Sequence, residues 1–224
     1  MPKQEGTNRQ HMKFILGTKG KMTTVFTEEG RAFAATVINA APNVVAQIKT
    51  AEKDGYDAVQ LGAFEAKEGR VSKPQVGHAK GKSLREFREL RPRPATKNGK
   101  VDTNFPEVGS TVDVSAFAVG DKVVVSAISK GRGFQGVIKR HGFHGGPRSH
   151  GQKHSEREPG SIGGSGGRAG GRVAKNMRMA GRMGGDRVTV KNLRVVKILP
   201  ETKEVFIVGA IPGRRGAKIE IKAK

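Results

Sequence analysis

The sequence predicts a mainly β protein: a small barrel with an inserted α+β unit and a long, extended arm rich in glycine and arginine. Short runs rich in β-branched residues recur along the chain, separated by Gly and Pro turn signals, which favours a barrel of short antiparallel strands. The stretch 131–182 breaks this pattern, because its 52 residues include 15 Gly and 11 Lys or Arg but few large apolar side chains. Such a segment cannot bury enough apolar surface to offset the entropy of ordering it.

The first barrel block is expected to cover 12–42, after an N-terminal tail at 1–11. Its strands are expected at three short apolar or β-branched runs, 14–16, 24–26 and 32–38. Gly17 is expected to end the first of these strands. Glu29 and Gly30 are expected to turn the chain before the third.

The inserted α+β unit is expected to cover 43–106. Two strands near 44–48 and 58–61 should be followed by a polar loop at 73–82 and, further on, by a polar linker at 95–104. Between loop and linker, 83–90 predicts a short helix. It begins with a serine that can cap a helix, has a glutamate three residues on, and places Leu84, Phe87 and Leu90 on one face.

The barrel is expected to resume at 107–130 and to finish with 183–224. Alternating or β-branched runs predict strands at 111–114, 122–128, 187–190, 193–199, 204–208 and 217–221. The arm, 131–182, therefore interrupts a set of strands and is too long for an ordinary loop. If it doubles back as a hairpin, each limb could reach at most ~80 Å.

Charge indicates a polyanionic partner. Lys and Arg number 42 and Asp and Glu 20, giving a formal net charge of +22, which bears on partners rather than on fold. No apolar run approaches the ~20 residues of a membrane span, and there is no Cys for disulfides or thiolate metal sites. With ten Phe, one Tyr and no Trp, a base-stacking platform for single strands is disfavoured. Contacts to the phosphates and sugars of folded RNA or duplex fit better.

Three short motifs resemble enzyme sites but lack their context. Residues 131–136 match G-x-G-x-x-G, yet the sequence from Val137 shows neither the helical periodicity nor the second strand that a dinucleotide site needs. Residues 163–167 fit G-x-S-x-G without the flanking strand and helix of a nucleophile elbow. Residues 77–83 fall one residue short of a P-loop. We therefore expect no catalytic residues and no cofactor.

Candidate RNA-binding residues lie in the arm. Its charged residues are nearly all positive and alternate with Gly, which lets backbone approach a phosphate closely. Four histidines there match no recognised metal-ligand spacing, so no metal site is expected and hydrogen bonds to phosphate or ribose are favoured. The candidates are Arg132, Lys139, Arg140, His141, His144, Arg148, His150, Lys153, His154, Arg157, Arg168, Arg172, Lys175, Arg178 and Arg182.

Several segments, in order, also carry a family resemblance. They are 44–50, 53–62, 120–123, 129–140, 146–151, 157–163, 179–184 and 187–190. With these segments, spread over nearly the whole chain, the sequence resembles the bacterial form of the L-three (uL3) family of large-subunit ribosomal proteins.

The resemblance implies a translation-protein-type β-barrel whose internal arm runs through the large-subunit rRNA toward the peptidyl transferase centre. It also implies binding of 23S rRNA near its 3′ end, a role in nucleating subunit assembly, and neighbouring large-subunit proteins as further partners. Members of the family are structural RNA binders of the cytoplasmic ribosome, not enzymes. We expect no membrane partner, no small-molecule substrate and no homo-oligomer.

Two features depart from the family pattern. Some bacterial members carry a methylated Gln directly after G-S-I-G, where this chain has Gly164, and 164–171 lacks the usual Thr-Pro. Composition by itself leaves two other classes open: a general duplex-binding or nucleoid protein, and an enzyme that binds a nucleotide at 131–136.

Overall fold

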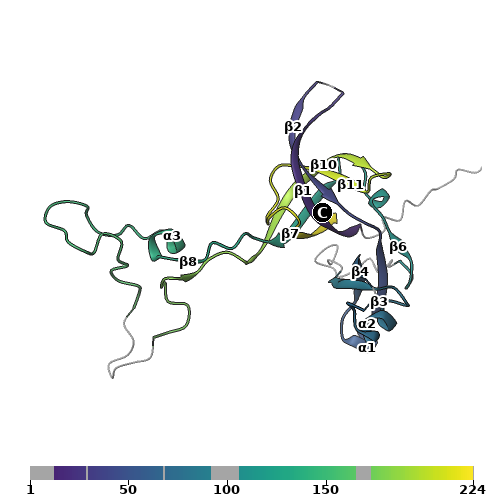
Figure 1. Ribbon diagram of the computed structural model, residues 1–224, viewed down its shortest axis with the longest axis horizontal. Helices are drawn as coiled ribbons and strands as arrows, with labels where there is room; N and C mark the ends of the chain where they lie inside the picture. The colour runs from purple at the N-terminus through teal and green to yellow at the C-terminus, as the bar shows by residue number, and fades with distance from the viewer. Residues whose placement is uncertain (1–12, 29, 68, 92–105, 165–172, 224) are drawn as a thin grey trace, which may run out of the picture. The chain divides into compact units, whose positions relative to one another are not determined.

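The computed structural model describes residues 13–28, 30–67, 69–91, 106–164 and 173–223. The tail predicted at 1–11 and the linker predicted at 95–104 lie outside these ranges. Strands dominate the secondary structure, so the mainly β class is confirmed. The chain forms two compact units, one made of residues up to Ile128 and from Val188 onward, the other of Ser129–Arg187 (Figure 1).

Six strands of the first unit close into a barrel in the order β1-β12-β7-β10-β11-β2. They are β1 (Phe14–Phe26), β2 (Ala32–Asn39), β7 (Lys122–Ile128), β10 (Arg187–Leu199), β11 (Glu204–Val208) and β12 (Lys218–Ala223). The five pairings given by register, β1 with β12 and β2, β12 with β7, β10 with β11, and β11 with β2, are all antiparallel. Closure leaves the barrel without the free edges that an open sheet exposes.

The barrel core is filled by alternate side chains of its strands. Ile219 and Ile221 of β12 and Val123 and Val125 of β7 are fully buried, and Ile207 of β11 meets them in the same cluster. The intervening residues of β12 are polar or charged, as the two-residue period of a strand with one buried face requires. The β-branched runs predicted as strands at 122–128 and 204–208 are therefore confirmed.

Strand β1 is longer than the sequence predicts. Gly17 was expected to end a strand, but β1 runs unbroken through it. A Cβ at Gly17 would lie 2.8 Å from Ile38 Cγ2 and 2.9 Å from the Asn39 carbonyl oxygen. The glycine thus permits close approach of β1 and β2 rather than a turn. A second strand is also longer than predicted, because the two strands predicted at 187–190 and 193–199 form one strand, β10.

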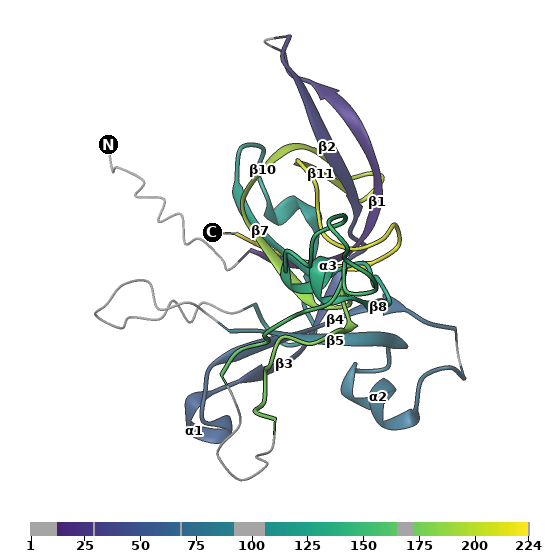
Figure 2. The same ribbon diagram turned by 90° about the vertical axis from the view of Figure 1, so that its left-hand side faces the viewer.

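A second, four-stranded sheet of the first unit has the order β5-β4-β3-β6 (Figure 2). Its strands are β3 (Asn43–Lys49), β4 (Ala58–Glu65), β5 (Leu84–Leu90) and β6 (Thr111–Val112), and its helices are α1 (Ala51–Asp54), α2 (Lys73–His78) and the 3-10 turn η1 (Val114–Ala116). The sheet packs on the barrel through β1, since Phe14 and Leu16 share a buried cluster with Val45, Val59 and Leu61. Because side chains alternate between the two faces of β1, this strand contributes to two hydrophobic cores.

The helix predicted at 83–90 is wrong, because these residues form β5 and pair with β4 from Val59–Leu90 to Glu65–Leu84. Glu86 and Arg88 hid the strand's alternation. Both carry charge in the middle of β5, where they form an ion pair with each other at 2.8 Å. Glu86 also pairs with Lys218 of β12, and Arg88 Nε lies 3.8 Å from Glu220 of the same strand. Lys218 of the barrel strand β12 thus supplies a partner for Glu86, whose side chain is only 12% exposed although the sequence pattern predicts it to face solvent, whereas Arg88 remains exposed.

The polar loop predicted at 73–82 is also partly wrong, because it contains the short helix α2. Ser72 stands at its N-cap, its backbone N–H donates to the Gln75 side chain at 3.3 Å, and Pro74 lies in the first turn. These are ordinary helix-start signals. The helix reaches the sheet through His78, whose ring lies 5.2 Å from that of Phe87.

A polar cluster joins β3 and β5. Lys49 donates to Tyr56 Oη at 2.9 Å and to Glu89 Oε1 at 2.6 Å, and Tyr56 donates to Glu89 Oε2 at 3.0 Å. The bond from Lys49 lowers the pKa of Glu89, and the same bond raises the pKa of Lys49. The Arg91 guanidinium lies 4.1 Å from the Tyr56 ring centre, a cation–π distance.

Gly17→Ala should destabilise the first unit. The added methyl would meet the Asn39 backbone, which cannot rotate away, so we expect a loss of about 1–3 kcal/mol in unfolding free energy. Gly77→Ala is the matched control, because a Cβ there meets no atom within 4 Å. Urea unfolding followed by circular dichroism measures both, and equal stabilities would show that β1 and β2 are not packed this closely.

Candidate nucleic-acid interface

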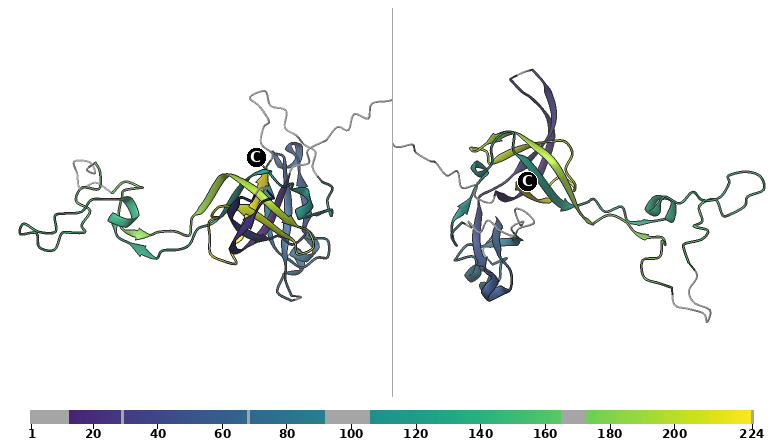
Figure 3. Two further views of the ribbon diagram at one scale, coloured as in Figure 1. Left: turned by 90° about the horizontal axis from the view of Figure 1, so that it is seen from above. Right: turned by 180° about the vertical axis from the view of Figure 1, so that it is seen from behind.

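The second unit is a hairpin closed at its base. Strand β8 (Phe134–Gln135) pairs antiparallel with β9 (Gly181–Arg182) (Figure 3). Backbone bonds extend the closure, from Arg132 N–H to the Met183 carbonyl at 2.9 Å and from Met183 N–H to the Gly133 carbonyl at 2.9 Å. The two limbs therefore do double back on each other, as one form of the prediction required.

A single helical turn, α3 (Val137–His141), follows β8, although the sequence predicted none there. Five residues are too few to show a helical period. Gly142, at φ 73°, ends the turn in the left-handed conformation. The G-x-G-x-x-G segment thus precedes one helical turn and lies in an antiparallel pair, which differs from the strand–helix–strand unit of dinucleotide sites.

Four of the candidate residues make side-chain contacts within the unit, and three of these contacts are to oxygen atoms. The Arg140 guanidinium donates to the Met179 carbonyl at 2.6 Å, and His141 Nε2 lies 3.0 Å from the same oxygen. Arg148 Nε donates to Glu156 Oε1 at 3.1 Å. The first two fasten one limb to the other, and the third spans the loop beyond α3, so these side chains shape the surface as well as contribute charge to it.

The loop beyond α3 depends on a glycine. Gly145 has φ 76°, and a Cβ there would overlap the Glu156 carbonyl oxygen. That same oxygen accepts the Gly146 N–H at 2.9 Å. The close approach lets two parts of this irregular loop share a backbone hydrogen bond without any buried core.

Most of the remaining candidates are exposed, and their side chains have no partner within the described residues. They are Lys139, His144, His150, Lys153, His154, Arg157, Lys175, Arg178 and Arg182. Arg132 is also exposed and approaches only the Met183 sulfur, at 3.8 Å. Arg168 and Arg172 lie outside the described residues. Unpaired cations on a surface rich in glycine suit contacts to phosphates from many directions.

Other kinds of site find no support in the described part of the chain. No three His, Cys, Asp or Glu side chains gather there in a group suited to a metal ion. No described helix is both long and apolar enough to cross a membrane.

Comparison with known proteins identifies the family. Residues 85–208 match the family model described as ribosomal protein L3. The chain belongs to the ribosomal protein L3 family. It is 50% identical over 209 residues to the large ribosomal subunit protein uL3 of Herpetosiphon aurantiacus, covering 92% of this chain and 94% of that protein. The uL3 proteins of Carboxydothermus hydrogenoformans and Chlorobium limicola are 48% and 44% identical, covering 94% of this chain and 96% and 98% of theirs.

The sequence prediction missed one basic element of this L3 family chain, the turn between β11 and β12. Arg214 and Arg215 are exposed there, and their side chains have no partner among the described residues. Strand β1 holds this turn in place, because Lys19 Nζ donates hydrogen bonds to the carbonyls of Ile211 and Gly213. The signal was present as Pro-Gly-Arg-Arg-Gly, the same alternation of Gly and Arg that marked the arm.

Gly145→Ala should loosen the loop beyond α3. The substitution adds both a left-handed strain and a clash with Glu156, whereas Gly151→Ala at φ 80° adds the strain alone, because its surroundings are open. Amide hydrogen exchange should therefore quicken at Gly146 in the first variant and stay near wild type in the second. Equal exchange at Gly146 in both variants would rule out the close contact.

Proposed function

We propose that this protein is a structural component of the large ribosomal subunit that binds 23S rRNA directly near its 3′ end and helps nucleate subunit assembly. Its family is one of ribosomal proteins rather than enzymes, and its bacterial members belong to the cytoplasmic ribosome. The relatives at 44–50% identity are each named a large ribosomal subunit protein. Neighbouring large-subunit proteins are the other expected partners.

One observation carries the RNA-binding part of the proposal. The second unit holds unpaired, exposed cations on a hairpin that its own backbone bonds close. A surface with so little apolar burial gains from a polyanion that packs around it, and the release of counterions favours that association. A nucleoid-type duplex binder would share this charge, but the family membership favours rRNA.

The proposed division of labour follows the domains expected from the sequence. The barrel of 12–42, 107–130 and 183–224, of the translation-protein type, would dock on rRNA together with the α+β subdomain at 43–106. The arm at 131–182 would extend through rRNA toward the peptidyl transferase centre. Arg214 and Arg215 give the barrel side its own exposed charge.

Neutralising arm lysines should flatten the salt dependence of RNA binding. Lys139→Gln, Lys153→Gln and Lys175→Gln together remove up to three phosphate contacts, so the slope of log affinity against log salt should fall by about two to three. Arginine at the same three positions keeps the charge and should keep the slope. Filter binding of the full chain to 23S rRNA measures it, and an unchanged slope in the glutamine variant would place these lysines off the RNA.

Deleting 134–180 should leave the first unit folded and impair subunit assembly. The deletion joins Gly133 to Gly181, and the bonds between Arg132, Gly133 and Met183 can still close the shortened hairpin. Circular dichroism and thermal melting should show an intact barrel, while sucrose gradients of cells carrying the variant should show fewer complete large subunits. An unfolded barrel would contradict the division of labour, and normal assembly would contradict the arm's role.

A further inference from the structure

The second unit contains an apolar pocket to which the arm's proposed phosphate contacts assign no role. Its lining includes Val137, Arg157, Pro159, Ile162, Met179 and Ala180, and its volume is about 370 Å³. That volume lies near the lower end of the ~300–1,000 Å³ found for small-ligand pockets. Arg157 is the only charged residue among the lining residues, and none of them carries a hydroxyl or an amide side chain.

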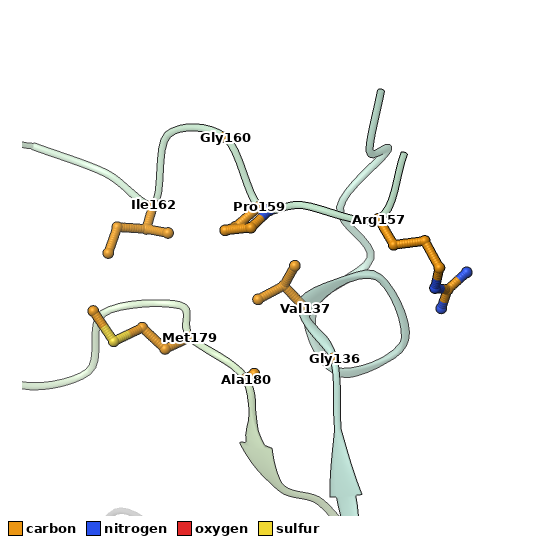
Figure 4. A pocket seen from close by; sticks show the side chains of 8 residues that line it. All are labelled: Gly136, Val137, Arg157, Pro159, Gly160, Ile162, Met179 and Ala180. Atoms are coloured by element: carbon orange, nitrogen blue, oxygen red, sulfur yellow. The ribbon is translucent and has the colours of Figure 1, made fainter. Parts of the chain in front are cut away.

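The pocket has two facing walls (Figure 4). Pro159 and Ile162 come from one limb and lie opposite Met179 and Ala180 of the other, with Val137 of α3 at the inner end. The Arg157 side chain points away from the space between the walls. Two aliphatic walls with a charge outside suit a flat, neutral group that is attached to an anion.

Contacts within the unit hold the walls in place. The Met179 carbonyl receives the Arg140 guanidinium at 2.6 Å, which ties its wall to α3. On the far side, a Cβ at Gly163 would lie 3.4 Å from the Met177 methyl group, so the limbs are in contact beside the pocket as well. Val137 is buried, whereas residue Met179 is 42% exposed, so apolar surface is left open to an occupant.

Charge complementarity selects the occupant. The chain carries a formal net charge of +22, and exposed cations flank the wall residues in sequence: Lys139 two residues after Val137, and Arg178 directly before Met179. An apolar side chain of a neighbouring protein could fill the walls but would leave these cations without a partner. A nucleotide of RNA brings both a flat base for the walls and phosphates for the cations.

We propose that the pocket between Ile162 and Met179 receives one unstacked nucleobase of the bound RNA, with Arg157 contacting an adjacent phosphate. The inference rests on the proposed RNA-binding function. Because no described lining residue offers a hydroxyl or amide to a base edge, the pocket holds the faces of the base and does not select its identity. This adds shape recognition of RNA to the arm's phosphate contacts.

Site-specific crosslinking tests the occupant directly. A short diazirine amino acid replaces Met179 in the full chain, produced in a bacterial host in place of its own copy, and large subunits are irradiated. Crosslinks should concentrate on one rRNA nucleotide. The same diazirine at Val173, which is exposed in the same unit but does not line the pocket, should react elsewhere.

The possible outcomes distinguish a nucleobase in the pocket from a protein side chain, and the failure of this proposal from the failure of the proposed function. Crosslinks from position 179 to another protein would overturn the nucleobase assignment in favour of a protein side chain. An absence of crosslinks from position 179 beside RNA crosslinks from position 173 would overturn it while leaving the proposed function intact. An absence of RNA crosslinks from both positions would contradict the proposed function as well.

Filling the pocket gives a second test with a matched control. Ala180→Leu places a larger side chain between the walls and should weaken binding of the full chain to 23S rRNA about ten-fold, or about 1.4 kcal/mol, because the base can no longer pack there. Ala174→Leu makes the same change at an exposed position outside the pocket and should leave affinity unchanged. Equal affinities of a folded Ala180→Leu variant and wild type would overturn the proposal.

Discussion

Strand β1 is the element on which the first unit depends, because its two faces belong to two different cores. Ile15 points into the barrel with Ile219 and Ile221, while Phe14 and Leu16 pack against the second sheet. Since side chains alternate along a strand, a slip of one residue would turn Ile15 toward the second sheet and Phe14 or Leu16 toward the barrel, and both cores would lose their packing. The close approach at Gly17 fixes β1 against β2 just beyond these residues.

The second unit is built on a different principle. None of the three buried clusters includes a described residue of Ser129–Arg187; backbone bonds, glycines in left-handed conformations and a few side-chain ties define it instead. Arg140 fastens the limbs and Gly145 permits the loop beyond α3. Cationic side chains that in a globular domain would surround a core are therefore exposed on both limbs, as the proposed binding of RNA requires.

Sequence predicts the strands whose hydrophobic pattern is undisturbed, as at 122–128 and 204–208. It fails where tertiary partners decide. Glu86 is predicted to lie on a helix surface because its partner Lys218 on β12 is remote in the sequence, and Gly17 is predicted to end a strand because its neighbours Ile38 and Asn39 on β2 are not adjacent in the sequence either. The candidate site shows the same limit: cations are visible in sequence, but not that Arg140 and Arg148 have partners within the unit, nor that Ile162 and Met179 face each other.

In-cell UV crosslinking, followed by sequencing of the attached nucleic acid, tests the central claim most directly. The account predicts crosslinks from the arm at a few sites of the large-subunit rRNA, because a surface fixed by backbone bonds should meet one RNA environment. Crosslinks spread over many RNAs, or found mainly on DNA, would contradict it and favour a general nucleic-acid binder.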